Sequence, residues 1–81
     1  MLDNQGKVVG IVRGTSKERG TNWTRISLVG AFENINGAEG QDAESIFFNR
    51  WLDVNVGDIV EVKYKPGWEG KAIPIGIIKL N

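Results

Sequence analysis

The sequence predicts an all-β protein, a small five-stranded antiparallel Greek-key barrel resembling the OB-fold. Three observations support this fold class: five segments rich in Val, Ile and aromatic residues, polar or glycine-rich turns between them, and no long stretch with helical periodicity. With 81 residues, the chain has room for one domain, residues 1–81. An SH3-like barrel also has about five strands, and it is the alternative.

The first two strands are expected at residues 7–13 and 23–32. The first, KVVGIVR, lies between two glycines and consists largely of β-branched residues. The second, WTRISLVGAF, alternates between two faces, as a half-buried strand does. We expect one face of it to carry Thr24, Ile26 and Leu28, and the other to carry Trp23, Arg25 and Ser27. Gly30 inside this segment suggests a bulge or a sharp bend.

A polar segment, residues 34–45, is expected to be a loop that leads to the third strand at residues 46–52. The acids of this loop lack the alternating oxygen ligands of a calcium-binding loop, so we expect them to be solvated; they are Glu39, Asp42 and Glu44. Alternation in the third strand groups Ile46, Phe48 and Arg50 against Phe47, Asn49 and Trp51. Either face could be the buried one.

The last two strands are expected at residues 59–65 and 71–80, joined by a hairpin loop. In the first of them Val60, Val62 and Tyr64 share one face. The connecting sequence PGWEG begins with Pro-Gly and ends with Gly, which is typical of a hairpin loop. Pro74 lacks a backbone donor, so its part of the last strand is expected at an edge or a bulge.

The composition argues against an enzyme. The chain has no cysteine and no histidine, which excludes a disulfide framework, a thiolate metal site, a thiol nucleophile and the usual general base. No serine or tyrosine hydroxyl therefore has a histidine to activate it. We expect a protein without catalytic residues, cofactor or metal. Polar residues interrupt the N-terminal segment, and no apolar run approaches the ~18 residues of a membrane span, so a cytoplasmic protein is expected.

A net charge of zero conceals a strong segregation of charge along the chain. Residues 1–30 carry a balance of +3, residues 31–60 a balance of −5, and residues 61–81 a balance of +2. In a barrel the two basic ends can converge on one side. The sequence therefore allows a basic patch that could attract a polyanion.

Two loops combine cations with a tryptophan: residues 15–23 and residues 65–71. In an OB-fold the corresponding loops flank the face of the second and third strands that binds oligonucleotides. Single-stranded nucleic acid requires cations along its phosphates and flat side chains on which its bases stack. The predicted binding residues are Arg13, Lys17, Arg19, Trp23, Arg25, Phe48, Arg50, Lys63, Lys65, Trp68 and Lys71.

The order of these features resembles a known family. A VxGI-type strand is followed by a basic SKERG loop, an aromatic strand, a VGDIVEV segment and a C-terminal IIKL strand. This arrangement is similar to that of the small single-stranded-DNA-binding, helix-destabilising proteins of filamentous phages and mobile elements. The resemblance implies an OB-type barrel that dimerises and coats single strands, with tryptophans in place of the family's stacking tyrosines.

The expected function is therefore non-enzymatic binding of single-stranded nucleic acid, with DNA as the expected ligand. An edge strand rich in isoleucine, residues 73–80, would gain by pairing with a second copy, so a homodimer is expected. The alternative function is a protein-interaction module in which Trp51 and Trp68 anchor a partner.

Overall fold

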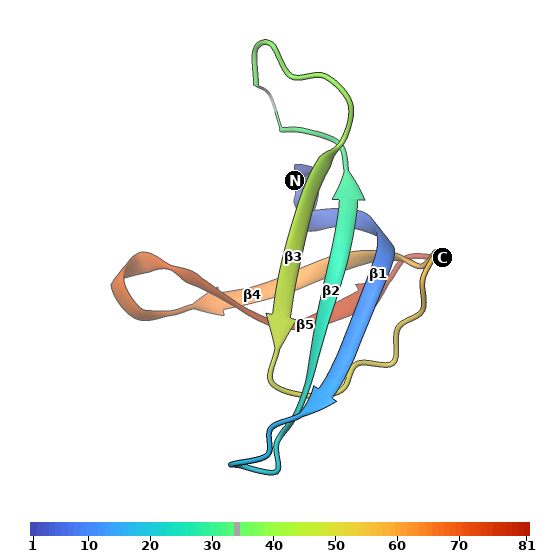
Figure 1. The fold of residues 1–81 in the computed structure, drawn as a ribbon. Coiled ribbons are helices and arrows are strands. Elements are labelled where there is room, and N and C mark those ends of the chain that lie inside the picture. Colours follow the sequence, from blue (N-terminus) through green and yellow to red (C-terminus); the bar gives the residue numbers. More distant parts are fainter. Residues whose placement is uncertain (34) are drawn as a thin grey trace.

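The computed structural model describes residues 1–33 and 35–81, and it contains five antiparallel strands in one open sheet (Figure 1). The strands are β1 (Gln5–Thr15), β2 (Asn22–Gly30), β3 (Asp42–Phe48), β4 (Ile59–Pro66) and β5 (Ala72–Lys79). Two single-turn 3₁₀ helices, η1 (Leu2–Asn4) and η2 (Trp68–Gly70), complete the regular structure of the described residues. The prediction of an all-β protein with five antiparallel strands is confirmed.

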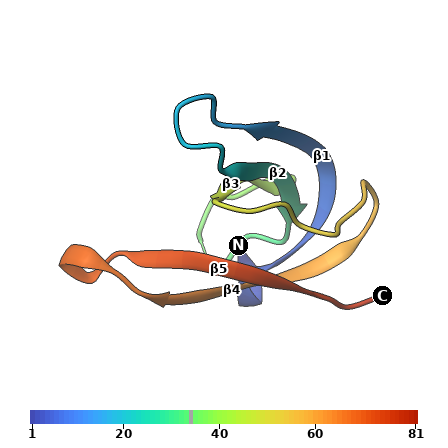
Figure 2. The ribbon, with the colours of Figure 1, turned by 90° about the horizontal axis from the view of Figure 1, so that it is seen from below.

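The sheet has the strand order β3-β2-β1-β4-β5. Hairpins join β1, β2 and β3, and β4 then returns to lie beside β1, which is the Greek-key order. β1 pairs with β2 along most of its length, but it pairs with β4 only through Gln5, Gly6 and Lys7. The sheet curls at this short ladder, and the β4–β5 hairpin consequently crosses over one face of β1, β2 and β3 (Figures 1 and 2).

β3 and β5 are the two edge strands of the sheet. Among the described residues no ladder pair joins them, so the sheet stays open at this side. The guanidinium of Arg50 spans the opening, because its Nη2 donates a hydrogen bond to the carbonyl oxygen of Ile75 at 2.6 Å. This contact holds the segment that follows β3 against β5.

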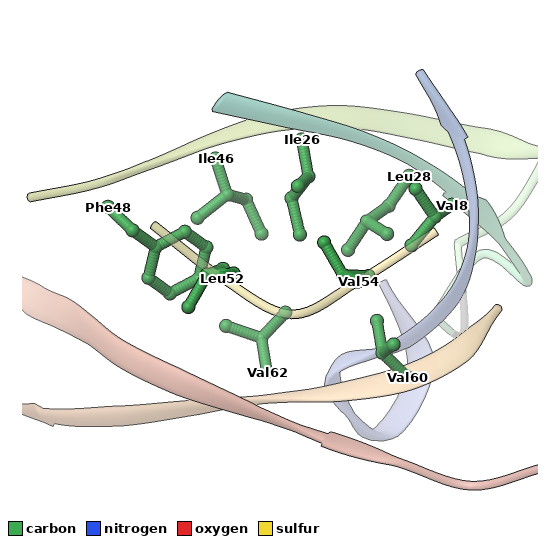
Figure 3. Close-up of a cluster of buried hydrophobic side chains, with 9 residues drawn as sticks. All are labelled: Val8, Ile26, Leu28, Ile46, Phe48, Leu52, Val54, Val60 and Val62. Carbon is green, nitrogen blue, oxygen red and sulfur yellow. The ribbon is translucent and has the colours of Figure 1, made fainter. Parts of the chain in front are cut away.

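The hydrophobic core fills the space between the two parts of the curled sheet (Figure 3). Its buried side chains are Val8, Ile26, Leu28, Ile46, Phe48, Leu52, Val54, Val60 and Val62. The alternation expected for the second and fourth strands is confirmed, because Ile26 and Leu28 of β2 and Val60 and Val62 of β4 are buried, whereas Arg25 and Lys63 are exposed. Each such side chain contributes about 1.5–3 kcal/mol when it is fully buried.

Thr24 is the buried polar side chain of this core. Its hydroxyl donates to the carbonyl oxygen of Arg50 at 2.8 Å and accepts from the backbone N–H of Leu52 at 3.1 Å. Both hydrogen-bonding capacities are thus used, which offsets the cost of burying the hydroxyl. The bonds fix the segment after β3 and bring Leu52 into the core.

The predicted position of the third strand is wrong by four residues at each end. β3 covers Asp42–Phe48, whereas the sequence pattern places it at residues 46–52. The first four residues of β3 are not buried, so their pairing with β2 leaves no hydrophobic signal in the sequence. Leu52 is buried, but it belongs to the irregular segment after β3, in which side chains do not alternate as they do in a strand.

Part of the predicted polar loop therefore belongs to β3. Asp42 begins the strand and lies 3.1 Å from the α-amino nitrogen of Met1, and Glu33 lies 3.7 Å from the same nitrogen. The hydrogen bond with Asp42 is the main reason why the pKa of this amino group is raised above 8.0. Of the three acids expected to be solvated, Asp42 is thus an ion-pair partner. Asn34, the first residue of the predicted loop, lies outside the described residues.

The two expected irregularities have different outcomes. The ladder between β2 and β3 runs through Gly30 without a register shift, so the expected bulge is absent there and β2 ends at this residue. The bulge lies instead between Val8 and Gly10 of β1. At Pro74 the expectation is confirmed, because β5 is an edge strand and its register with β4 shifts next to this proline.

Candidate nucleic-acid interface

Two aromatic rings stack on the outer face of the sheet. The ring centroids of Trp23 on β2 and Phe47 on β3 are 5.7 Å apart, with 28° between the planes. Phe47 is 50% exposed and Trp23 is half-buried. The pair therefore offers an aromatic surface to solvent at the end of β3.

A glycine in the neighbouring strand makes room for this pair. Gly14 of β1 lies opposite Trp23 in the ladder. A Cβ atom at this glycine would lie 2.5 Å from Cζ2 of Trp23 and 2.7 Å from Cε2. The indole therefore lies directly over the backbone of β1, in space that any other residue would fill.

An arginine lies beside the aromatic pair. Arg25 is paired with Val12 of β1 on one side and with Phe47 of β3 on the other, and it is exposed. Within residues 1–33 and 35–81, no carboxylate lies within 4.0 Å of the charged nitrogens of Arg25, Arg19 or Lys17. Their charges remain available to an anionic ligand.

The loop between β1 and β2 is held in one shape by its own hydrogen bonds. The N–H of Ser16 donates to Thr21 and the N–H of Gly20 donates to Ser16, both at 2.8 Å. Gly20 has a φ of 64°, in the left-handed region that favours glycine. An open cavity of about 400 Å³ lies between the loop and the aromatic pair, and it is lined by Ser16, Glu18, Arg19, Thr21, Trp23, Phe47 and Asn49.

The assignment of Phe48 to this interface is wrong. Phe48 is 2% exposed and lies in the core, so neither face of its ring is open to a ligand (Figure 3). Phe47, which strand alternation places on the opposite face, is the exposed ring. The sequence indicates that one of the two is buried, and only the pairing with β2 decides which.

Two of the predicted cations hold backbone segments together. Nη2 of Arg13 donates to the carbonyl oxygens of Leu52 at 3.1 Å and Val54 at 2.8 Å. Arg50 bonds to the carbonyl oxygen of Ile75, as described above. Both arginines are exposed, and their binding to phosphate stays a prediction.

The β4–β5 hairpin forms the second predicted group. Trp68 at its tip is 88% exposed, and Lys65 and Lys71 beside it are exposed as well. Lys63 lies farther along β4, where its ammonium is 2.6 Å from the carboxylate of Glu61. The hydrogen bond from Lys63 is the main cause that lowers the pKa of Glu61.

The end of β3 lies between the two groups, as Figures 1 and 2 show. A cavity of about 370 Å³ runs from β3 to the hairpin, and its lining includes Phe47, Glu44, Tyr64 and Pro74. Burial raises the pKa of the Tyr64 phenol, and the charge of Glu44 raises it further. Phe47 lines both this cavity and the one beside the β1–β2 loop, so its ring lies between the two cavities.

Trp51 is an aromatic residue outside the predicted set that lies near the pair. It is 55% exposed, and its Nε1 donates to the carbonyl oxygen of Gly14 at 3.1 Å. The same glycine lies beneath Trp23. Trp51 and Trp23 therefore both contact Gly14 of β1. The strand predicted at residues 46–52 gives no indication of this contact.

The described part of the chain contains no group of three His, Cys, Asp or Glu residues placed to hold a metal ion. It also contains no helix with the length and apolar character needed to cross a membrane. Comparison with models of protein families, with curated proteins and with solved structures gave no match to this chain.

Proposed function

We propose that the protein binds single-stranded nucleic acid, with DNA as the expected ligand, and that it does so without catalysis. The observation that carries this proposal is the exposed Trp23–Phe47 pair on the outer face of β2 and β3. Every base has a flat face that can stack on such a surface, whatever its sequence.

The charges around the aromatic pair support the same function. Arg25 lies next to Phe47, and Arg19 lines the cavity beside it. A strand whose bases stack on the pair places its phosphates within reach of such cations. The β4–β5 hairpin, with Lys65, Trp68 and Lys71, would contact a strand that continues along the β3 cavity.

The architecture supports an OB-type barrel as the finer description of the fold. The Greek-key order, the curl of the sheet and the position of β3 next to β5 suit a partly open barrel. In that fold the face of the second and third strands, with the first and last hairpin loops, binds oligonucleotides. The proposed surface uses the same elements.

We further propose a homodimer that pairs through the β5 edge. Ile73, Ile75 and Ile78 on this strand are 39%, 45% and 46% exposed. Exposed edge strands with apolar residues gain by pairing. Sedimentation analysis tests this point, since a monomer at all concentrations would reject it.

The test of binding is a titration with oligo(dT) followed by tryptophan fluorescence at two salt concentrations. Stacking predicts quenching, and phosphate contacts predict weaker binding at the higher salt concentration. Phe47→Leu should weaken binding by about 1–3 kcal/mol. Val56→Ala serves as the control, because Val56 is 64% exposed and lines neither cavity at the aromatic pair. An absence of quenching at low salt concentration rejects the proposal.

A second candidate function is protein interaction through exposed tryptophans, as in aromatic hot spots. The 88% exposure of Trp68 favours this function, because an exposed indole at a hairpin tip can insert into a pocket of a partner protein. A chain that binds no oligonucleotide, but associates with itself through Trp68, would support this candidate. The oligo(dT) titration, together with sedimentation of the wild type and of Trp68→Ala, distinguishes the two functions.

A further inference from the structure

We infer that the cavity between the β1–β2 loop and the aromatic pair holds a single unstacked base, and that Glu18 makes it selective for bases with an exocyclic amino group. The inference rests on the proposed function and names the ligand chemistry of one part of that surface.

The size and the lining of the cavity suit one base. Its volume of about 400 Å³ lies at the lower end of the range of ligand pockets, about 300–1,000 Å³. One part of its lining is aromatic, from Trp23 and Phe47, and the rest is polar. An aromatic surface with polar groups around it is what an unstacked base requires, since its face stacks and its edge forms hydrogen bonds.

The polar lining includes one acid, and this acid determines the preference. Glu18 lies at the tip of the β1–β2 loop, and no cation lies within 4.0 Å of its carboxylate in the described chain. A carboxylate repels phosphate, so its presence among cations weakens general binding. An ionised carboxylate can only accept hydrogen bonds, so it favours a base edge with donors.

The edges of the bases differ in this respect. Cytosine presents an amino donor at position 4, with which a carboxylate pairs well. Uracil and thymine carry a carbonyl oxygen there, which is an acceptor and repels the carboxylate. The other polar groups of the cavity, those of Ser16, Thr21 and Asn49, can bond to either type of edge. The discrimination therefore depends on Glu18.

The backbone of the loop that carries this acid is closed before a ligand arrives. Besides the two backbone bonds that close the loop, Oγ1 of Thr15 donates to Oδ1 of Asn22 at 2.9 Å, across the base of the loop. A loop whose backbone is already ordered loses less conformational entropy on binding. Selectivity therefore does not require the loop to reorganise.

The experiment compares oligo(dC) with oligo(dU), about twelve nucleotides long, at pH 8. These two ligands share one backbone and differ only at the base edge. We expect the wild type to bind oligo(dC) about tenfold more tightly, the effect of one hydrogen bond to a charged group. Glu18→Gln should bind both ligands more tightly and lose the preference, because glutamine offers a donor as well as an acceptor and carries no charge.

The matched control is Glu39→Gln, which removes the same charge from the loop between β2 and β3. This loop and the β1–β2 loop lie at opposite ends of β2 (Figure 1). It should keep the wild-type preference. Equal affinity of the wild type for both ligands would overturn the inference and leave the proposed function standing. A preference that persists in Glu18→Gln would also overturn it. Failure of both oligonucleotides to bind would refute the proposed function itself.

Discussion

Replacing Gly14 by alanine should displace Trp23 and change the free energy of unfolding only slightly. The variant therefore tests the role of Trp23 in binding separately from the stability of the fold. The new Cβ would lie 2.5 Å from Cζ2 of Trp23, whereas carbon atoms in contact are about 3.5–4.0 Å apart. The indole must therefore move by roughly 1 Å or more away from the backbone of β1, and we expect this shift to disturb its stack on Phe47.

The expected effects on folding are small and of opposite sign. Loss of the aromatic pair costs about 0.5–1.5 kcal/mol. The alanine restricts the unfolded chain, which contributes about 0.4–1 kcal/mol in the other direction where it fits the backbone. Gly14 has no positive φ, so alanine is compatible with its backbone. The free energy of unfolding should change by less than about 1 kcal/mol.

The expected effect on binding is larger. If bases stack on Trp23 and Phe47, Gly14→Ala should weaken oligo(dT) binding by about 1–3 kcal/mol, roughly fivefold to 150-fold. Fluorescence titration measures the affinity and urea unfolding measures the stability. Gly10→Ala is the matched control, since its Cβ would meet Ser27 at 3.6 Å, an ordinary contact. Wild-type affinity and an unchanged tryptophan spectrum in Gly14→Ala would refute the reasoning.

Three further predictions concern single side chains. Arg13→Lys should lower the free energy of unfolding by about 1–3 kcal/mol, because lysine cannot reproduce both bonds to the segment after β3; urea unfolding measures this. Wild-type stability in that variant would contradict the assigned role. Because the pKa of Tyr64 is raised above 10.0 in the fold, the neutral phenol stabilises the protein below pH 10, and this contribution is lost as the pH rises through the raised pKa. Tyr64→Phe should therefore lose less stability than the wild type between pH 9 and pH 11 in unfolding experiments, and parallel curves would count against this. Trp68→Ala should change stability by less than about 0.5 kcal/mol, because the side chain is 88% exposed. In the oligo(dT) titration it should weaken binding by about 1–3 kcal/mol, and unchanged affinity would assign Trp68 to another role.

Strand alternation predicts the strands of this fold that have one buried face and one solvent-exposed face. In β2 and β4 the expected inward residues, such as Ile26 and Val62, are those that the core contains. The rule fails for β3, because its first four residues place no buried side chain on either face. A strand of that kind leaves no period in the sequence.

The candidate site shows the same division. Strand alternation correctly places Trp23 and Arg25 on the outer face, and the polarity of the β1–β2 loop is visible in the sequence. The stacking of Phe47 on Trp23 depends on the register between two strands, which composition does not encode. The hydrogen bonds from the Arg13 guanidinium to backbone carbonyl oxygens cannot be predicted from the sequence either, because they join residues about forty positions apart. The role of Gly14 is hidden as well, because the sequence pattern places this glycine at the end of the first strand, whereas β1 continues to Thr15.

The narrow ladder between β1 and β4 has a consequence for how the chain folds. β1, β2 and β3 form one unit with hairpin connections, and β4 and β5 form another. In the described part of the chain, three ladder pairs join β1 to β4, the first of them between Gln5 and Glu61, and Val8 adds backbone hydrogen bonds with Gly57 and Asp58 just before β4. Contacts this far apart in the chain carry the largest entropy of loop closure. We therefore expect each unit to form before the two dock, and we expect their docking around the shared core to limit the folding rate.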